Sequence, residues 1–264
     1  MLESDYQALV AAKQLLEQHS FLQRVLEVLG KPAGFALRQL PGQARQTLAR
    51  VVNTSLARAV DMACWSLSEQ GRNHKRAHWA AVVGTGAVAG AFGLAGLAVD
   101  LPLTTTLMLR SIAQIAREQG ENLALPESRL ACVQVLGMGA GDLDGGYLGV
   151  RALLAREIQA AAAWLGSETA ARQGASPLLA QLVEKLATRF GVVVEEKLAA
   201  QMVPVIGALG GATINALFMS FFQDKAQGHF TYRRLERTYG AEVVRVRYQE
   251  IDIDGLDSGG QKAS

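Results

Sequence analysis

Apolar residues recur every three or four positions along most of the chain, which is the spacing of one face of an α-helix. Residues 3–29 show this spacing first, and Gly30-Lys31-Pro32 ends it. Pro41-Gly42 opens a second segment, which reaches Gln70-Gly71. The same period returns over residues 103–117, 129–136, 148–165 and 177–199. No strands alternate with these segments, so the pattern predicts an all-α helical bundle.

Two uncharged, glycine-rich runs interrupt the amphipathic pattern: Trp79 to Val99 and Leu198 to Phe222. Gly86 and Gly90 are four residues apart, so on a helix they share one face and let a neighbouring backbone come close. Glycine inside a helix costs about 0.5–1 kcal/mol relative to alanine, and tight packing must compensate for that cost. We predict that the bundle is built around both runs. The expected packing glycines are Gly86, Gly90, Gly93, Gly207, Gly210 and Gly211.

The sequence also suggests how the chain is divided. We expect an N-terminal helical segment over residues 1–40, a helical domain over 41–250 and a disordered tail over 251–264. The segment EVVRVRYQEI near the C-terminus has the alternation of a short β-strand. One isolated strand cannot form a stable sheet, so this possible β segment does not change the all-α expectation.

The two uncharged runs leave two environments open. Each run has about the 20 residues that a membrane span needs, yet each also suits a buried helix of a soluble bundle. Basic clusters flank the pair on its outer sides, where they could contact anionic headgroups or form ordinary solvated faces. Phe230 and Tyr232 could then sit at the membrane interface. The candidate headgroup contacts are Arg72, Lys75, Arg76, Lys225, Arg233, Arg234 and Arg237.

Composition excludes some partners and compartments. Half of the residues are hydrophobic, 19% are charged and the net charge is +2, so no nucleic-acid footprint is expected. The two cysteines, Cys64 and Cys132, stand far apart in apolar surroundings, as buried thiols of a reducing compartment do. The first residues include early acidic side chains and no long apolar core of a signal peptide. We therefore expect a cytoplasmic protein.

Known catalytic and metal-binding signatures are missing from the sequence. His74 and His78 have helical spacing, but Lys75 stands where a zincin needs glutamate. The run GTGAVAG is not followed by Lys-Ser/Thr, so it is not a P-loop. Residues 142–145 resemble the start of a calcium loop but lack its later ligands. We expect no metal or cofactor and assign no catalytic residue; enzymatic activity stays open, with non-enzymatic roles favoured.

Two polar residues stand out as a candidate buried site: Asp100, which closes the first apolar run, and Asn215, inside the second. We expect Asp100 to cap the helix that follows it by accepting from backbone N–H groups near Thr104, and a polar site at a helix junction is the alternative. Asn215 lies inside the second run, where a buried amide would bond a neighbouring helix. If the two runs pack together, Asp100 and Asn215 could meet.

The glycine-rich runs also carry a likeness to a known family. The first run ends in Asp-Leu-Pro at residues 100–102, and the second reads PVIGALGGATINALF over 204–218. These segments, with the tail HFTYRRLERTYG, resemble the EcsC protein family over about residues 40 to 250. The second run matches its pattern at Pro204, Gly207, Gly210, Gly211 and Asn215. The family is bacterial and is named for a gene that lies beside an ABC transporter gene. The resemblance therefore implies a bacterial protein, and it supplies no catalytic residue.

Three functions follow as hypotheses. The first is a membrane-associated accessory factor, peripheral on the inner face of the cell membrane, with an anionic surface or a membrane protein as partner and a possible link to an ABC transporter or secretion. The second is a soluble helical carrier that holds a lipid or other apolar ligand in a glycine-lined interior. The third is a hydrolase or peptidase with a site that the sequence does not reveal.

Overall fold

The computed structural model describes residues 1–17, 20–28, 42–65, 93–140, 146–167, 176–202 and 210–252. Every regular element in these ranges is a helix, which confirms the all-α prediction. In chain order they are α1 (Glu3–Glu17), α2 (Phe21–Val28), α3 (Gly42–Trp65), α5 (Gly93–Glu118), α6 (Pro126–Gln134), the 3₁₀ helix η2 (Val135–Met138), α7 (Gly146–Leu165), α8 (Pro177–Met202), α10 (Gly210–Tyr239) and α11 (Ala241–Glu250).

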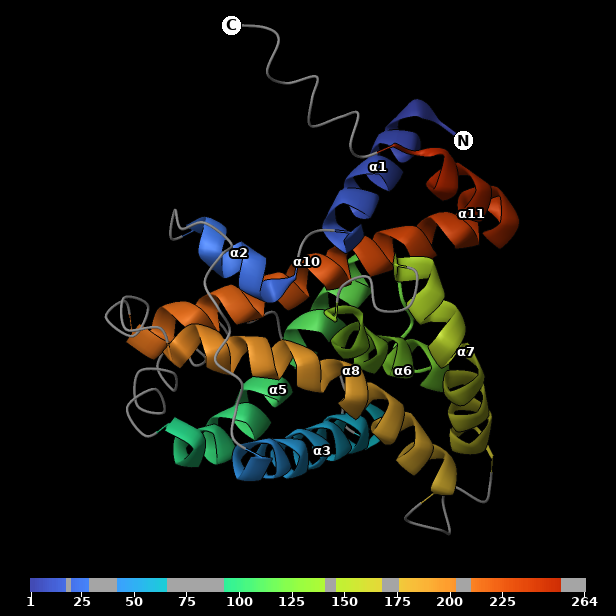
Figure 1. Cartoon of the computed structure of the whole chain (residues 1–264). Helices are drawn as coiled ribbons and strands as arrows, with labels where there is room; N and C mark the ends of the chain where they lie inside the picture. Colours follow the sequence, from blue (N-terminus) through green and yellow to red (C-terminus); the bar gives the residue numbers. More distant parts are fainter. Residues whose placement is uncertain are drawn as a thin grey trace, which may run out of the picture.

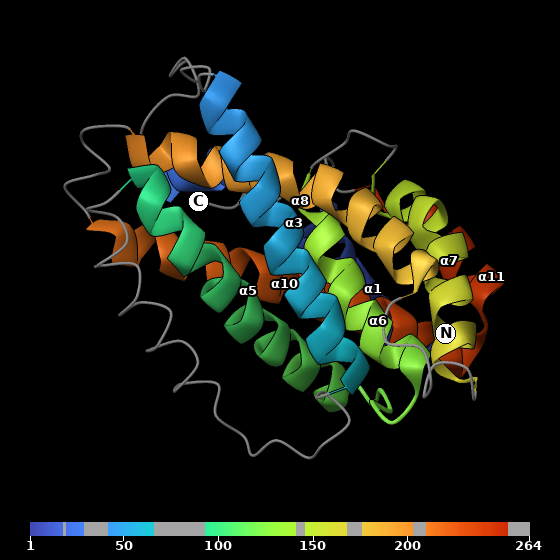
Figure 2. The ribbon, with the colours of Figure 1, turned by 90° about the horizontal axis from the view of Figure 1, so that it is seen from below.

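Four long helices form the centre of the bundle. Helix α3 lies between α5 and α8, and α10 crosses behind them (Figure 2). With 30 residues, α10 is about 45 Å long and reaches from one end of the molecule to the other (Figure 1). Helices α6 and α7 pack beside α3 and α8. One continuous apolar core joins all of these elements.

The N-terminal helix packs on the C-terminal half of α10, beside α11 (Figure 1). Two lysines tie these helices together by satisfying carbonyl groups at helix ends, which have no partner within their own helix. Lys225 Nζ donates to the carbonyl oxygen of Leu16 at 2.7 Å. Lys13 Nζ donates to the carbonyls of Tyr248 and Ile251 at 2.9 and 2.7 Å. The first and last helices are therefore fixed by specific polar contacts as well as by apolar packing.

Glycines with positive φ end two of the long helices. Gly120, with φ of 81°, follows α5; its N–H bonds to the carbonyl of Arg117, and the N–H of Glu121 bonds to that of Ala116. This pair of bonds is the Schellman arrangement, in which glycine adopts the left-handed conformation without strain. Gly240, with φ of 87° and ψ of 145°, separates α10 from α11 in an extended conformation of positive φ that glycine adopts readily.

The prediction of a possible strand near the C-terminus is wrong, because this segment forms helix α11. Its buried side chains, Val244 and Tyr248, are four residues apart and lie on one helical face. Ion pairs at i,i+3 spacing, Arg245 with Glu242 and Arg247 with Glu250, line its exposed side. A strand would have lacked any partner to satisfy its backbone, whereas a helix bonds its own.

Other boundaries also differ from the sequence pattern. Helix α5 begins at Gly93, ten residues before the expected start, and Pro102 lies inside it. The single helix expected over 3–29 is found as two separate helices, α1 and α2. Helix α10 continues through the polar residues after Asp224 to Tyr239.

Candidate functional site

Asp100 lies in the interior of the bundle rather than at a helix start. It stands seven residues after Gly93 on α5 and is 4% exposed, so the expected capping role is wrong. Its Oδ1 accepts a hydrogen bond from Thr104 Oγ1, one turn along the helix, at 3.0 Å. The aspartate therefore does not serve free backbone N–H groups at a helix start, and its charge must be balanced by other helices.

That balance comes from Lys197 on α8. Its Nζ donates to Asp100 Oδ2 at 2.8 Å, and its side chain is fully buried. The same ammonium lies 4.8 Å from the ring centroid of Phe218, within the range of a cation–π interaction. Burial lowers the pKa of Lys197, and the Asp100 carboxylate acts in the opposite direction. The pair is thus a buried ion pair that holds α5 and α8 together.

Asn215 completes the cluster from α10. Its Nδ2 donates to Asp100 Oδ1 at 3.0 Å, and the residue is fully buried. The structure therefore brings together the two polar residues singled out in the sequence, through packing of α5 against α10. We call Asp100, Thr104, Lys197 and Asn215 the Asp100 cluster; it links three of the four central helices.

The Asp100 cluster also aligns three helix ends. Asp100 is seven residues from the start of α5, Asn215 five from the start of α10, and Lys197 five from the end of α8. At about 1.5 Å per residue, all three ends lie about 8–10 Å from the cluster along their helices. The three ends gather on the same side of the molecule in both ribbon views (Figures 1 and 2). We call this side, formed by Gly93, Met202 and Gly210, the junction end.

The uncharged runs continue the chain from the junction end. Residues 79–92 lead into α5, and residues 203–209 connect α8 to α10. These connecting residues lie outside the described part of the chain, as do Gly86, Gly90 and Gly207. Gly93, Gly210 and Gly211 are the first residues of α5 and α10. Among the described helices, none combines the length and hydropathy that crossing a membrane requires.

Of the basic candidates for headgroup contacts, Lys225 is buried and Arg233 is partly buried, and both are paired within the molecule. Lys225 is 3% exposed and caps α1, with its ammonium 5.3 Å from the Phe221 ring centroid. Arg233 donates to Glu121 from Nε at 2.8 Å and from Nη2 at 3.2 Å. Phe230 and Tyr232, expected at an interface, are buried in the core. Burial of Lys225, Phe230 and Tyr232 and the pairing of Arg233 with Glu121 therefore argue against a membrane contact through these residues.

The other two arginines of this segment are partly exposed and paired within the chain. Arg234 Nη1 donates to Asp5 Oδ1 at 3.2 Å. Arg237 donates to Glu121 and, from Nη2, to the carbonyl of Gln119 at 2.7 Å, at the end of α5. Both side chains join the C-terminal half of α10 to other helices, and these contacts compete with a role at a membrane surface. Arg72, Lys75 and Arg76 lie outside the described residues.

Sequence reasoning missed most members of the buried polar groups. The apolar stripe of α8 passes through Phe190 and Val193, and Lys197 is the next position on that face, so helical spacing could have found it. Arg233 and Glu121 are 112 residues apart, and nothing local in the sequence pairs them. Both cysteines are buried and free. The described residues contain no group of three or more histidine, cysteine or acidic side chains placed to hold a metal ion.

Comparison with known families gives one match. A family model described as the EcsC protein family matches residues 6–235. No curated protein and no solved structure matches the chain. The matched range extends from α1 to the last turns of α10, so it includes all four residues of the Asp100 cluster.

Proposed function

The chain belongs to the EcsC protein family, and we propose that it is a membrane-associated accessory factor that approaches an anionic membrane surface with its junction end. In this proposal the protein is cytoplasmic and binds peripherally to the inner face of the cell membrane. A membrane protein, such as a transporter, would be its partner there.

One observation supports the proposal above the others: three helix ends that carry uncharged, glycine-rich connections lie level with one another. Residues 79–92 and 203–209 contain no charged side chain, so neither segment would bring a charge into a bilayer. Small residues such as glycine and alanine add little bulk to a segment that enters the interface. An uncharged surface of this kind gains free energy from burial against lipid, at about 25 cal/mol per Å² of apolar area.

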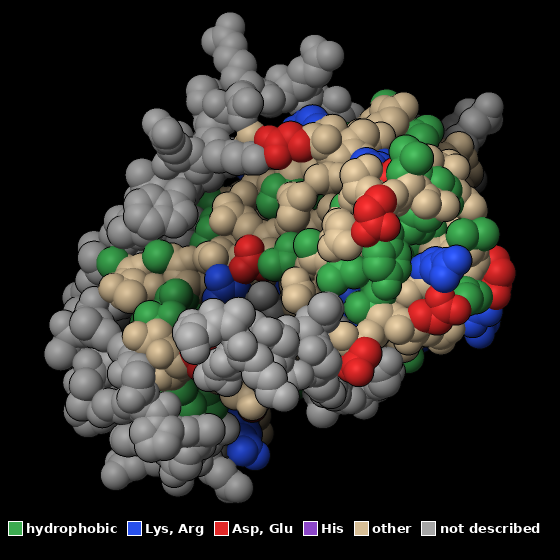
Figure 3. Space-filling view, turned by 90° about the horizontal axis from the view of Figure 1, so that it is seen from above, with side chains coloured by type: hydrophobic (Ala, Val, Ile, Leu, Met, Phe, Trp, Pro, Cys, Tyr) green, Lys and Arg blue, Asp and Glu red, His purple; other side chains and the backbone are tan. Residues whose placement is uncertain are grey.

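Charge compensation inside the bundle also favours the junction end as the side that faces the membrane. Lys197 and Asp100 neutralise each other about two turns from the junction end, so this buried pair brings no net charge to it. On the face seen in Figure 3, over described residues away from the grey atoms, acidic and basic side chains are interspersed, and neither sign gathers into a patch. We assign the electrostatic attraction to Arg72, Lys75 and Arg76, because they directly precede the first uncharged run. Each such cation adds about 1 kcal/mol near an anionic surface.

Vesicle flotation tests this proposal. The purified protein is expected to float with vesicles rich in anionic lipid, to bind neutral vesicles weakly and to be released by high salt, which screens headgroup attraction. Replacing Arg72, Lys75 and Arg76 with glutamine should weaken binding. The matched control replaces Arg156, Arg245 and Arg247, which are exposed on α7 and α11, and should bind as the unmodified chain does. Flotation with neither kind of vesicle would overturn the proposal.

A further inference from the structure

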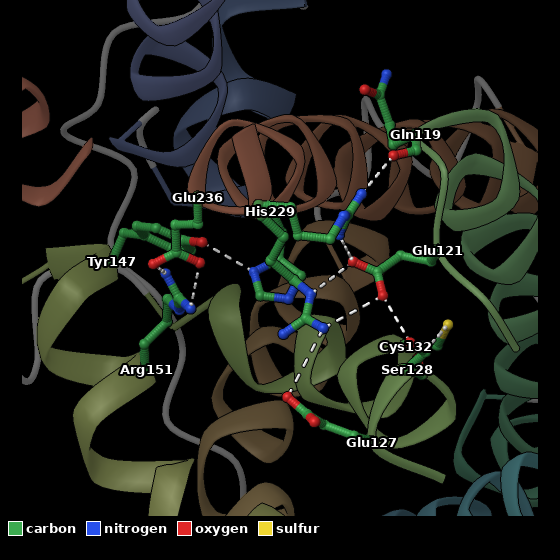
Figure 4. Close-up of polar contacts among 11 residues, drawn as sticks. Gln119, Glu121, Glu127, Ser128, Cys132, Tyr147, Arg151, His229 and Glu236 are labelled. Carbon is green, nitrogen blue, oxygen red and sulfur yellow. Dashed lines mark hydrogen bonds and ion pairs between the residues drawn. The ribbon is translucent and has the colours of Figure 1, made fainter. Parts of the chain in front are cut away.

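A second buried polar group lies on α10, remote from the junction end. His229 is fully buried, and its Nδ1 is 2.9 Å from the Oη of Tyr147 in the first turn of α7 (Figure 4). Its other ring nitrogen, Nε2, is buried and has no hydrogen-bond partner among the described residues. Aromatic rings enclose it: Tyr147 at 5.9 Å and Phe230 at 4.9 Å between ring centroids. The imidazole thus has one polar contact and an otherwise apolar surrounding.

Two arginine–glutamate pairs flank this histidine (Figure 4). On one side Arg151 binds both carboxylate oxygens of Glu236, each at 2.9 Å. On the other side Arg233 binds Glu121. Both glutamates are thus engaged by arginines, and neither is recorded as bonding the imidazole. Other titratable groups on the helices around the ring include Tyr232 of α10, which lies beside Tyr147, and Glu127 and Cys132 of α6. Tyr248 of α11 donates from Oη to Glu17 of α1, and Asp5 of α1 accepts from Arg234 and Tyr239.

A proton on His229 would therefore be costly in the folded protein. It would create a cation in an apolar site, with no recorded acceptor at Nε2 and with two guanidinium groups nearby. Burial first, and then the charges of Arg151 and Arg233, lower the pKa of His229 well below its ordinary value. In the unfolded chain the ring takes up a proton at about pH 6.5. Below that pH the unfolded state binds one more proton than the folded state, so stability falls as pH falls.

The contacts of Tyr147 show which elements depend on this site. Its ring lies 5.2 Å from that of Tyr232 on α10 and 5.6 Å from that of Tyr248 on α11, measured between centroids. Tyr248 in turn donates to Glu17 of α1 at 2.8 Å. The start of α7, α11 through Tyr248 and the end of α1 through Glu17 thus meet around the Tyr147–His229 pair. Displacement of this pair would loosen all three from α10.

We propose that His229 is an acid-sensitive switch, whose protonation separates the start of α7, together with α11 and the end of α1, from the C-terminal half of α10. The proposal rests on the buried Tyr147–His229 contact between two arginines and does not depend on membrane binding. The rest of the bundle, which contains the Asp100 cluster, keeps its contacts when this layer opens, because α3, α5, α8 and the N-terminal half of α10 also pack directly on one another.

Equilibrium unfolding by urea between about pH 7.5 and pH 5 tests the switch. The equilibrium constant for unfolding should rise up to about tenfold per pH unit below pH 6.5 in the unmodified chain, because one proton is taken up. In His229→Asn, whose amide can still bond Tyr147, this contribution should be absent. The control replaces His19, His74 and His78 with asparagine and should keep it. An unchanged pH dependence in His229→Asn would overturn the proposal.

Two measurements on the unmodified chain keep the test valid if His229→Asn fails to fold. By NMR, the His229 ring should stay neutral in the folded protein at about pH 6.5, where an ordinary histidine side chain takes up a proton, and a titration at that pH would contradict the proposal. By hydrogen exchange, protection factors at residues 147–151 and 244–248 should fall on acidification before those of α5 and α8. Loss of protection at the same pH throughout the chain would show global unfolding and contradict a local switch.

Discussion

The ammonium of Lys197 lies 2.8 Å from the carboxylate of Asp100, and both groups are buried between α5, α8 and α10. Such a pair contributes little net stability, because desolvation of the two charges offsets their attraction. Replacement of only one of the two residues is strongly destabilising, because the other charge then stays unpaired in the core. The pair therefore fixes how three helices align more than it adds to the free energy of unfolding.

Breaking the pair should be far more costly than deleting it. We expect Asp100→Asn and Lys197→Met each to lower the free energy of unfolding by about 3–5 kcal/mol, and the double variant to recover much of that loss. The control Arg247→Gln breaks an exposed ion pair on α11 and should change stability by less than about 1 kcal/mol. Denaturant unfolding measures all four. A nearly silent Asp100→Asn would revive the capping role that the structure argues against.

The close approach of α1 to α10 depends on Gly228. A Cβ at this position would lie 2.7 Å from Leu16 Cγ and 2.9 Å from the carbonyl oxygen of Ala12, so Gly228→Ala should destabilise the protein by about 1–3 kcal/mol. Gly191 of α8 is the matched control, because no described neighbour lies within 4 Å of its added Cβ. Gly191→Ala should stabilise by about 0.5–1 kcal/mol, as alanine does inside a helix. Thermal unfolding of the two variants should shift in opposite directions.

Glu121 should contribute to stability only where it is ionised. Burial raises its pKa, but hydrogen bonds from Arg233 and Ser128 outweigh that effect and the net shift is downward. A carboxylate with a lowered folded pKa stabilises the protein above its unfolded value of about 4.3, and this contribution is lost as pH falls through the folded pKa. Glu121→Gln should therefore remove part of the stability loss below about pH 4.3. If Glu121→Gln and the unmodified chain lost stability identically as pH falls, this role of Glu121 would be contradicted.

Arg233→Gln should also destabilise the chain, by about 1.5–3 kcal/mol, the usual value of hydrogen bonds to a charged group. As mere headgroup contacts, Arg233, Arg234 and Arg237 would be replaceable without loss of stability. The contacts with Glu121, Gln119 and Asp5 predict the opposite for stability. Circular dichroism during thermal unfolding measures the loss.

The two thiols should be unreactive in the folded protein. Burial raises the pKa of Cys64 to about 11 and raises that of Cys132 still further. Since the thiolate is the reactive form, a thiol reagent should label neither cysteine at neutral pH without denaturant, and both in urea. Rapid labelling of Cys132 under native conditions would show that α6 is not packed as described.

How far the sequence predicts this structure depends on whether a contact has a local signal. The helical period predicted the bundle, and the positions of Asp100 at the end of the first apolar run and Asn215 inside the second were enough to anticipate their meeting. The charged partner, Lys197, was hidden because a lysine in an amphipathic helix is usually exposed, although its place on the apolar stripe of α8 marked it. Glu121 and Arg233 meet only through tertiary packing, and no local pattern encodes that.

The C-terminal segment shows a different limit. Alternation of valine and arginine over 244–247 fits a strand, and buried positions at 244 and 248 fit a helix equally well. Tertiary packing decides between the two, because Tyr248 fits against Tyr147 and Tyr232 only on one face of a helix. Short segments whose side chains suit both periods cannot be assigned without that packing partner.

Lipid contact by the segment before the junction end is the most direct test of the proposed function. Trp79 opens the first uncharged run, and the other tryptophans, Trp65 and Trp164, can be replaced with phenylalanine. With anionic vesicles that carry brominated acyl chains, fluorescence of Trp79 should be quenched, whereas a control chain that retains only Trp164, on α7, should not be. Quenching of neither tryptophan, with the protein folded and vesicles present in excess, would contradict the membrane-associated function.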